Sequence, residues 1–179
     1  MPFPMIHLCI AKKILNATLR ISKPYEFLLG SIAPDSVHFR PNYNSEMKKI
    51  SHLCVGDEKW GLVSNNSEWY INVLKFLELN KQSKNIDFIL GYCSHILADI
   101  RNNIVIWTPF RIEHCDDLDK GIGSQYHKEA AEVDFELFRT HMERDTIWEL
   151  LKQSKGIDID GLVNAIDINK LKFHISYEQ

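Results

Sequence analysis

The stretch from residue 85 to residue 107, NIDFILGYCSHILADIRNNIVIW, most constrains how this chain can fold. Its side chains are apolar almost all round a helix, so the helix is expected to be buried at the centre of its domain. His95 and Asp99 nevertheless lie within it, about one helical turn apart and therefore on one face. Burying two polar groups is costly unless they are paired. The partner could be the other residue of the pair, the backbone or a metal ion.

The rest of the chain predicts further helices and no strands. Residues 36–64 are polar, aromatic and irregular, and residues 110–123 are acidic, so both are expected to be loops. No hairpin signal, internal repeat or low-complexity segment occurs. The prediction is an all-α, multi-helix bundle that forms one domain over residues 1–179. Apolar spacing and capping residues predict helices over residues 4–21, 22–35, 65–82, 124–141 and 145–154, and one short helix in the tail from residue 157.

Composition excludes several classes of protein. The net charge of −3 provides no overall positive field for a nucleic-acid backbone. No run of apolar residues reaches the roughly 18 that a membrane span needs. The four cysteines form no CxxC pair, and the first residues lack the pattern of an export signal. A reduced, cytoplasmic protein is therefore expected.

Three further polar residues stand beside apolar residues or at the ends of predicted elements. His7 lies on the apolar stripe of the first helix, Asp35 follows a proline in GSIAPDS, and His52 lies in the long loop, in ISHLC. Singly, such residues are more often a core histidine, a turn aspartate and a loop histidine, and an isolated H-x-x-x-D is more often a hydrogen-bonded core pair. Together with His95 and Asp99, they offer three imidazoles and two carboxylates. That is the ligand set of a zinc-type site.

The order of these residues resembles that of the zinc-dependent phospholipase C family, which shares its fold with the S1/P1-type nucleases. The resemblance is carried by LLGSIAPDS, SHL and GYCSHILAD, and it runs from His7 to Asp99 and more weakly to about residue 145. It implies one zinc ion held by Asp35, His52, His95 and Asp99.

The resemblance also implies further zinc ions. Asp99 would bridge to a second ion held by His7 and, in the family, by an N-terminal tryptophan; this chain begins Met-Pro instead. A third ion would take a histidine near position 105, where this chain has Val105, and a later His and Asp or Glu pair. Two pairs are candidates for that role, His127 with Asp134, which is slightly favoured, and His141 with Asp145.

The function implied by the resemblance is that of a zinc-dependent hydrolase, or one that uses another divalent transition ion. Metal-activated water would attack a phosphodiester-type substrate, a small phosphoester or a lipid headgroup, and Asp35 would orient or deprotonate that water. Phe39, Tyr43 and Trp60 of the long loop would shape the substrate entrance or pack the loop down. Two alternatives stand beside this function. One is a non-catalytic, metal-stabilised helical binding module; the other is an HD-type phosphohydrolase, although the chain has no adjacent His-Asp doublet.

Overall fold

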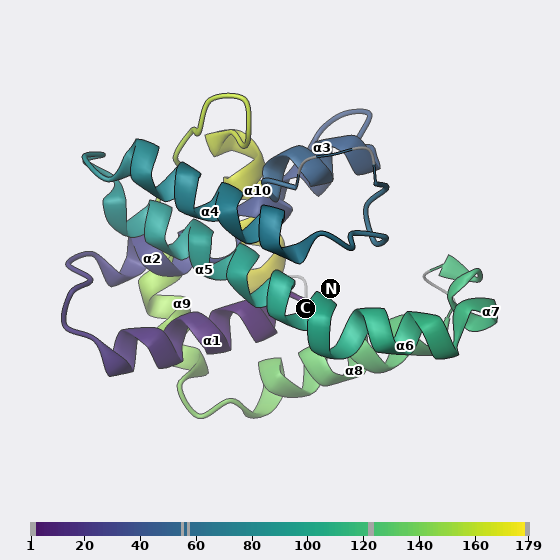
Figure 1. Ribbon diagram of the computed structural model, residues 1–179. Helices are drawn as coiled ribbons and strands as arrows, with labels where there is room; N and C mark the ends of the chain where they lie inside the picture. The colour runs from purple at the N-terminus through teal and green to yellow at the C-terminus, as the bar shows by residue number, and fades with distance from the viewer. Residues whose placement is uncertain (1–2, 55, 57, 122–123, 178–179) are drawn as a thin grey trace.

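The computed structural model describes residues 3–54, 56, 58–121 and 124–177 and is built from helices (Figure 1). Within this part of the chain, the only β-structure is an isolated bridge between Ile159 and Val163. The all-α prediction is therefore confirmed. The elements are α1 (Pro4–Ala17), α2 (Pro24–Gly30), the 3₁₀-helix η1 (Ala33–Phe39), α3 (Ser45–Ser51), α4 (Asn66–Asn80), α5 (Ile86–Asn102), the π-helical turn η2 (Asn103–Trp107), α6 (Thr108–Glu113), α7 (Cys115–Leu118), α8 (Gln125–Thr140), α9 (Arg144–Gln153) and α10 (Ala165–Tyr177).

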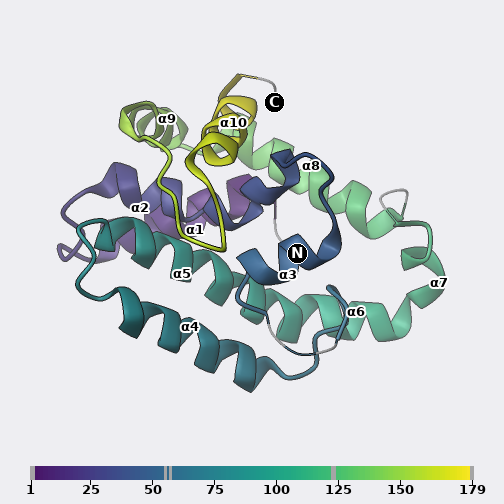
Figure 2. The same ribbon diagram turned by 90° about the horizontal axis from the view of Figure 1, so that it is seen from above.

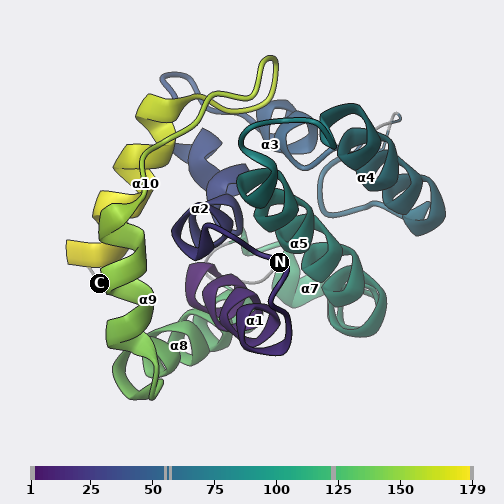
Figure 3. The ribbon, with the colours of Figure 1, turned by 90° about the vertical axis from the view of Figure 1, so that its left-hand side faces the viewer.

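Helix α5 lies at the centre, with α4 along one side and α1 and α2 along the other (Figures 1 and 2). Phe88, Tyr92 and Ile96 on this helix are fully buried in the hydrophobic core. Seen end-on, α1 and α2 lie between α5 and the C-terminal helices α9 and α10 (Figure 3). The segment 85–107 is therefore buried through most of α5, as expected, but its C-terminal end is not: Ile104, Val105 and Ile106 of η2 are 44–50 % exposed. No described helix has both the length and the apolar character needed to cross a membrane.

Helices α2 and α5 approach each other backbone to backbone. A Cβ atom on Gly30 would collide with the carbonyl oxygen of Phe88, and one on Gly91 would collide with the carbonyl oxygen of Phe27. Only glycine permits such a close approach. The two glycines of the LLGSIAPD and GYCSHILAD motifs therefore set the distance between the two segments that carry the polar residues.

Both predicted loops contain helices, so these two expectations were wrong. Residues 36–64 include the end of η1 and the whole of α3, which Asn44 caps by accepting a hydrogen bond from the Met47 amide at 3.1 Å. Residues 110–123 include the end of α6 and α7, while residues 122–123 lie outside the described part. Helices of four to seven residues are too short to show the apolar periodicity on which the prediction depended.

Helix α10 fastens the C-terminal part of the chain onto η1. Arg40, directly after η1, pairs with Asp167 of α10 at 3.2 Å and donates to the Leu162 carbonyl at 2.8 Å. Phe39 contacts the ring of His174 edge-on, with 5.7 Å between the ring centroids. The tail therefore covers the segment that carries Asp35.

Candidate metal centre

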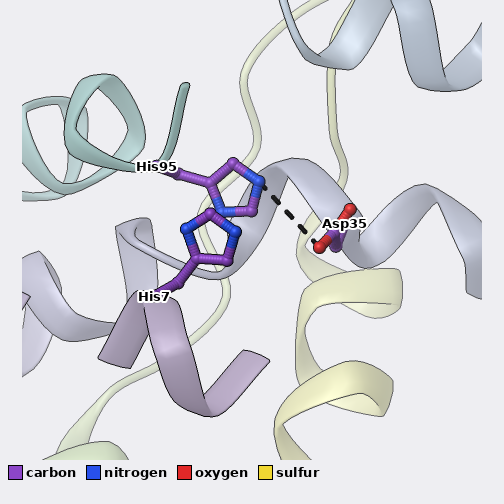
Figure 4. A group of neighbouring side chains, drawn as sticks. All are labelled: His7, Asp35 and His95. Carbon is purple, nitrogen blue, oxygen red and sulfur yellow. Dashed lines mark ion pairs between the residues drawn. The ribbon is translucent and has the colours of Figure 1, made fainter. Parts of the chain in front are cut away.

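Four elements bring five of the predicted residues together. His7 comes from α1, Asp35 from η1, His52 from the C-terminal end of α3, and His95 and Asp99 from α5. Figure 4 shows His7, Asp35 and His95 converging from their three segments. The histidines and Asp99 are at most 2 % exposed, and the Asp35 side chain is 14 % exposed. The cluster is therefore buried and reaches the surface on the Asp35 side.

The separations within this cluster define two groups of three residues with metal-ligand spacing: His52 with His95 and Asp99, and His7 with Asp35 and His95. The Nε2 atoms of His52 and His95 are 3.2 Å apart, and Asp99 Oδ2 lies 3.4 and 3.6 Å from them. Asp35 Oδ1 is 3.4 Å from His52 Nε2, and Asp35 Oδ2 is 3.9 Å from His95 Nε2. Four bonds of about 2.0–2.2 Å in a tetrahedron keep ligand atoms about 3.3–3.6 Å apart. The carboxylate–imidazole distances are too long for good hydrogen bonds, so direct pairing explains them poorly.

The backbone fixes the tautomer of both histidines. His95 Nδ1 lies 2.8 Å from the Ser31 carbonyl oxygen, and His52 Nδ1 lies 2.9 Å from the Lys48 carbonyl oxygen. A carbonyl only accepts, so each Nδ1 carries the proton, and each Nε2 of the neutral ring keeps a bare lone pair. Metal-binding histidines commonly show this arrangement, with the second ring nitrogen donating to a carbonyl or carboxylate.

Neighbouring side chains hold the His52 segment in place. The Trp69 indole donates to the His52 carbonyl at 2.7 Å, and the Tyr92 hydroxyl donates to the Ser51 carbonyl. Leu53 then takes a left-handed conformation, with φ of 55°. Tyr92 lies within the GYCSHILAD motif, so the helix that supplies His95 and Asp99 also anchors the segment that supplies His52.

His7 and Asp99 contain the buried polar atoms that most need a partner. Both ring nitrogens of His7 and both carboxylate oxygens of Asp99 lack a hydrogen-bond partner among the described residues. His7 Nε2 lies 3.5 Å from Asp99 Oδ1, the oxygen that does not face His52 and His95. The two oxygens of Asp99 thus face two different sets of imidazole nitrogens. This is the arrangement needed for a carboxylate that bridges two ions.

Burial governs the charges of the cluster. It lowers the pKa of His7 to about 3 and also lowers those of His52 and His95, so all three rings are neutral at pH 7. Burial, together with the nearby Asp35 carboxylate, raises the pKa of Asp99 to about 8. Burial would also raise the pKa of Asp35, but Lys48 and the histidines outweigh it and hold that pKa well below its ordinary value.

The candidate third-site residues do not join this cluster. Asp134 Oδ1 accepts hydrogen bonds from the Met5 and Ile6 amides at 2.9 and 3.2 Å, so Asp134 caps the N-terminus of α1. His127 lies on the wall of the adjoining cavity, with Nδ1 2.7 Å from the Ser124 hydroxyl. The described groups with metal-ligand spacing include neither residue.

The other candidate pair is also absent from these groups. His141 follows the end of α8, and its Nδ1 accepts from the Glu143 amide at 3.3 Å. The Asp145 side chain is 87 % exposed and pairs with Arg144.

Lys48 is the residue of the site that was not identified from the sequence. Its ammonium group lies 2.9 Å from Asp35 Oδ1 and 3.1 Å from His38 Nε2, and 5.3 Å from the centroid of the Trp60 ring. Burial would lower the pKa of Lys48, but the carboxylates of Asp35 and Asp99 raise it, so the ammonium stays charged. Lys48 precedes His52 by one helical turn, a signal that becomes visible only if α3 is expected.

A cavity of about 600 Å³ opens next to Asp35. Trp60 and Trp107 contribute aromatic walls, and the Trp107 indole donates to the Gly61 carbonyl at 2.7 Å. The polar lining comes from Asp35, Lys48 and histidines that include His127. The cavity gives a small molecule access to the exposed edge of the buried cluster. Of the three aromatic residues expected at a substrate entrance, Phe39 and Trp60 line this cavity, and Tyr43 is not among its lining residues.

No protein-family model, curated protein or solved structure matches this chain. The resemblance to the zinc-dependent phospholipase C family therefore stays a prediction. The donor set, the uncompensated lone pairs and the ligand spacing of the cluster fit a zinc ion on their own physical terms.

Proposed function

We propose that this chain binds zinc through Asp35, His52, His95 and Asp99 and hydrolyses a phosphodiester-type substrate in the adjoining cavity. One observation carries the proposal. Two neutral imidazoles present bare Nε2 lone pairs to each other at 3.2 Å, beside a carboxylate that forms no hydrogen bond with either. Electron pairs held this close repel each other unless a cation lies between them. A divalent ion with a preference for nitrogen and oxygen ligands removes that repulsion.

A second ion, held by His7 and Asp99 Oδ1, belongs to the same proposal. Both ring nitrogens of His7 are buried without a hydrogen-bond partner among the described residues, and a ligand would satisfy one of them. The two carboxylate oxygens of Asp99 allow it to serve both ions.

The catalytic part of the proposal depends on how the cluster meets the cavity. Bound zinc supplies a Lewis acid that polarises a phosphoryl oxygen and lowers the pKa of water. Asp35 is the ligand that also lines the cavity, and its lowered pKa keeps it ionised at neutral pH. It can therefore accept a hydrogen bond from an attacking water and hold that water in line with the phosphorus atom. Trp60 and Trp107 offer flat surfaces to the organic part of the substrate.

Metal content is the first test of this proposal. Protein purified without added metal and then given zinc is expected to hold one to two zinc ions per chain by elemental analysis. His95→Ala and Asp99→Ala are each expected to lose at least one of them. His141→Ala serves as the matched control, because His141 lies outside the groups with ligand spacing. Unchanged zinc content in both cluster variants would contradict the assignment of the ligands.

Turnover is the second test. The zinc-loaded protein is expected to hydrolyse bis(4-nitrophenyl) phosphate, and a chelator is expected to abolish that activity. 4-Nitrophenyl phosphate, a monoester, is the comparison substrate and is expected to react more slowly. Bound zinc without turnover of either ester, or of phospholipid and dinucleotide substrates, would contradict the hydrolase and favour a metal-stabilised binding module.

A further inference from the structure

Lys48 places a positive charge beside the residues that we propose bind a metal cation. Its side chain is only 12 % exposed, and it extends from α3 across Trp60 to Asp35. Without a metal ion, Lys48 is the only lysine or arginine among the described residues that lies within ion-pair distance of Asp35, with its ammonium 2.9 Å from Oδ1. Lys48 therefore neutralises Asp35 in this state.

A metal ion changes that balance. Two carboxylates, Asp35 and Asp99, balance one divalent ion, and an imidazole that binds a metal ion is neutral. The charge of Lys48 is then left without a compensating carboxylate. Asp35 is the only carboxylate among the described residues that line the cavity. The loaded cavity consequently carries an excess of positive charge, and a second ion would increase it.

The neighbours of Lys48 hold its ammonium at the cavity wall when a metal ion, rather than Lys48, balances the charge of Asp35. His38 Nε2 accepts from it at 3.1 Å, and the ring of Trp60 lies beneath it. Neither neighbour neutralises the charge, and both hold the long side chain in one place. An ordered ammonium next to a metal site is a typical point of attachment for an oxygen of a phosphate group.

We propose that Lys48 is the anion-binding residue of the cavity: it binds a phosphoryl oxygen of the substrate and selects substrates whose organic part carries no positive charge. This inference rests on the proposed function, because Asp35 must be engaged by a metal ion before Lys48 is available. It adds a specificity that the ligand set alone does not contain. A phosphodiester with a neutral or anionic organic group is accepted, and one with a quaternary ammonium group is disfavoured by repulsion from Lys48.

Binding of inorganic phosphate to the zinc-loaded protein tests this directly by calorimetry. Lys48→Met keeps most of the apolar stem and removes the charge, and it is expected to weaken phosphate binding about tenfold or more. Lys49→Met is the matched control: Lys49 is the next residue of α3, is also buried, and bonds to the Gly56 carbonyl outside the cavity. Lys49→Met is expected to bind phosphate like the wild type.

Zinc content, measured on the same samples, separates the two proposals. If the wild type and Lys48→Met both hold zinc and bind phosphate equally well, the role of Lys48 is contradicted while the metal site stands. If zinc-loaded wild type binds no phosphate, the anion site is contradicted as well. If no zinc binds to the wild type, the proposed function fails, and the inference fails with it.

Substrate preference gives an independent readout. Bis(4-nitrophenyl) phosphate and 4-nitrophenyl phosphorylcholine release the same leaving group but differ in the charge of the remaining organic part. The wild type is expected to show the higher kcat/KM on the first ester. Lys48→Met is expected to reduce this preference at least threefold, mainly by raising KM for the first ester. An unchanged preference would contradict the inference, since a purely structural role would lower both activities together.

Discussion

The Nε2 atoms of His52 and His95 face each other at 3.2 Å, while each Nδ1 donates its proton to a backbone carbonyl oxygen. Two separate segments, the end of α3 and the middle of α5, are thus held so that two lone pairs converge. Holding the two lone pairs together costs free energy in the metal-free protein, and this free energy is recovered when a cation binds. The first prediction concerns the size of that recovery.

Zinc is expected to raise the melting temperature of the wild type. At a free zinc concentration of about one hundred times Kd, a single site adds about 2.7 kcal/mol to the free energy of unfolding. In a chain of this size, that corresponds to a rise of about 5–10 °C, measurable by differential scanning calorimetry. His95→Ala is expected to lose this rise, whereas His141→Ala keeps it. A zinc-independent melting temperature in the wild type would contradict the metal site.

The stability of the metal-free protein is expected to fall as the pH rises from 7 to 8. Asp99 has a pKa of about 8 in the folded protein, raised from 3.8. A raised pKa adds stability at low pH, and this stability is lost as the pH rises through the folded value. The expected loss is about 1 kcal/mol between pH 7 and pH 8, measured by urea unfolding in the presence of a chelator.

Asp99→Asn is the control for this pH dependence. The amide has nearly the same shape but no proton to lose, so the loss between pH 7 and pH 8 is expected to disappear. The three buried histidines act in the opposite direction, because their folded pKa values are lowered below 6.5 whereas the unfolded chain still binds some protons at pH 7. This smaller contribution is present in both proteins. An equal slope in both proteins would show that Asp99 is not the titrating group.

Gly91→Ala is expected to destabilise the protein although alanine is the better helix former. The added Cβ would collide with the Phe27 carbonyl and push α2 away from α5. Overpacking of this kind costs about 1–3 kcal/mol. Because Ser31 lies at the end of α2, the shift would also weaken its bond to His95 Nδ1, so zinc affinity is expected to fall. Leu97→Ala, at a half-exposed position of α5, is the comparison and is expected to leave zinc affinity unchanged.

Asp134→Ala is expected to lower stability without changing the zinc content. Asp134 caps the first turn of α1, and loss of such a cap costs about 1–2 kcal/mol. Chemical denaturation measures the first effect, and elemental analysis measures the second. A zinc content lower than that of the wild type would contradict a purely capping role and would indicate that Asp134 is a ligand of the third ion that the family resemblance implies.

The sequence allowed the centre of the fold to be predicted because α5 is long and strongly apolar. On such a helix, His95 and Asp99 are conspicuous, and their spacing alone places them on one face. His7 and Asp35 were identifiable only as part of the same ordered set. The distances that make the set a candidate site depend on Gly30 and Gly91, whose close contact is a tertiary feature.

Other parts of the site could not be predicted, for physical reasons that differ between residues. Lys48 lies on α3, which is too short to show the apolar periodicity of a helix. In a segment predicted to be a loop, the four-residue spacing of Lys48 and His52 did not indicate that the two side chains share a face. Asp134 and His127 are seven residues apart and share a face of α8, but packing against α1 turns one to a helix end and leaves the other at the cavity. Local spacing does not determine which neighbour a helix face meets.

The most direct measurement is an anomalous difference map at the zinc absorption edge, from crystals of the protein grown with zinc. The expected result is a peak within about 2.0–2.2 Å of His52 Nε2, His95 Nε2 and an oxygen each of Asp35 and Asp99. A second peak next to His7 and Asp99 Oδ1 would add the bridged ion. A map with no peak at the four ligands, or with zinc bound only elsewhere on the chain, would contradict the metal centre and the function proposed from it.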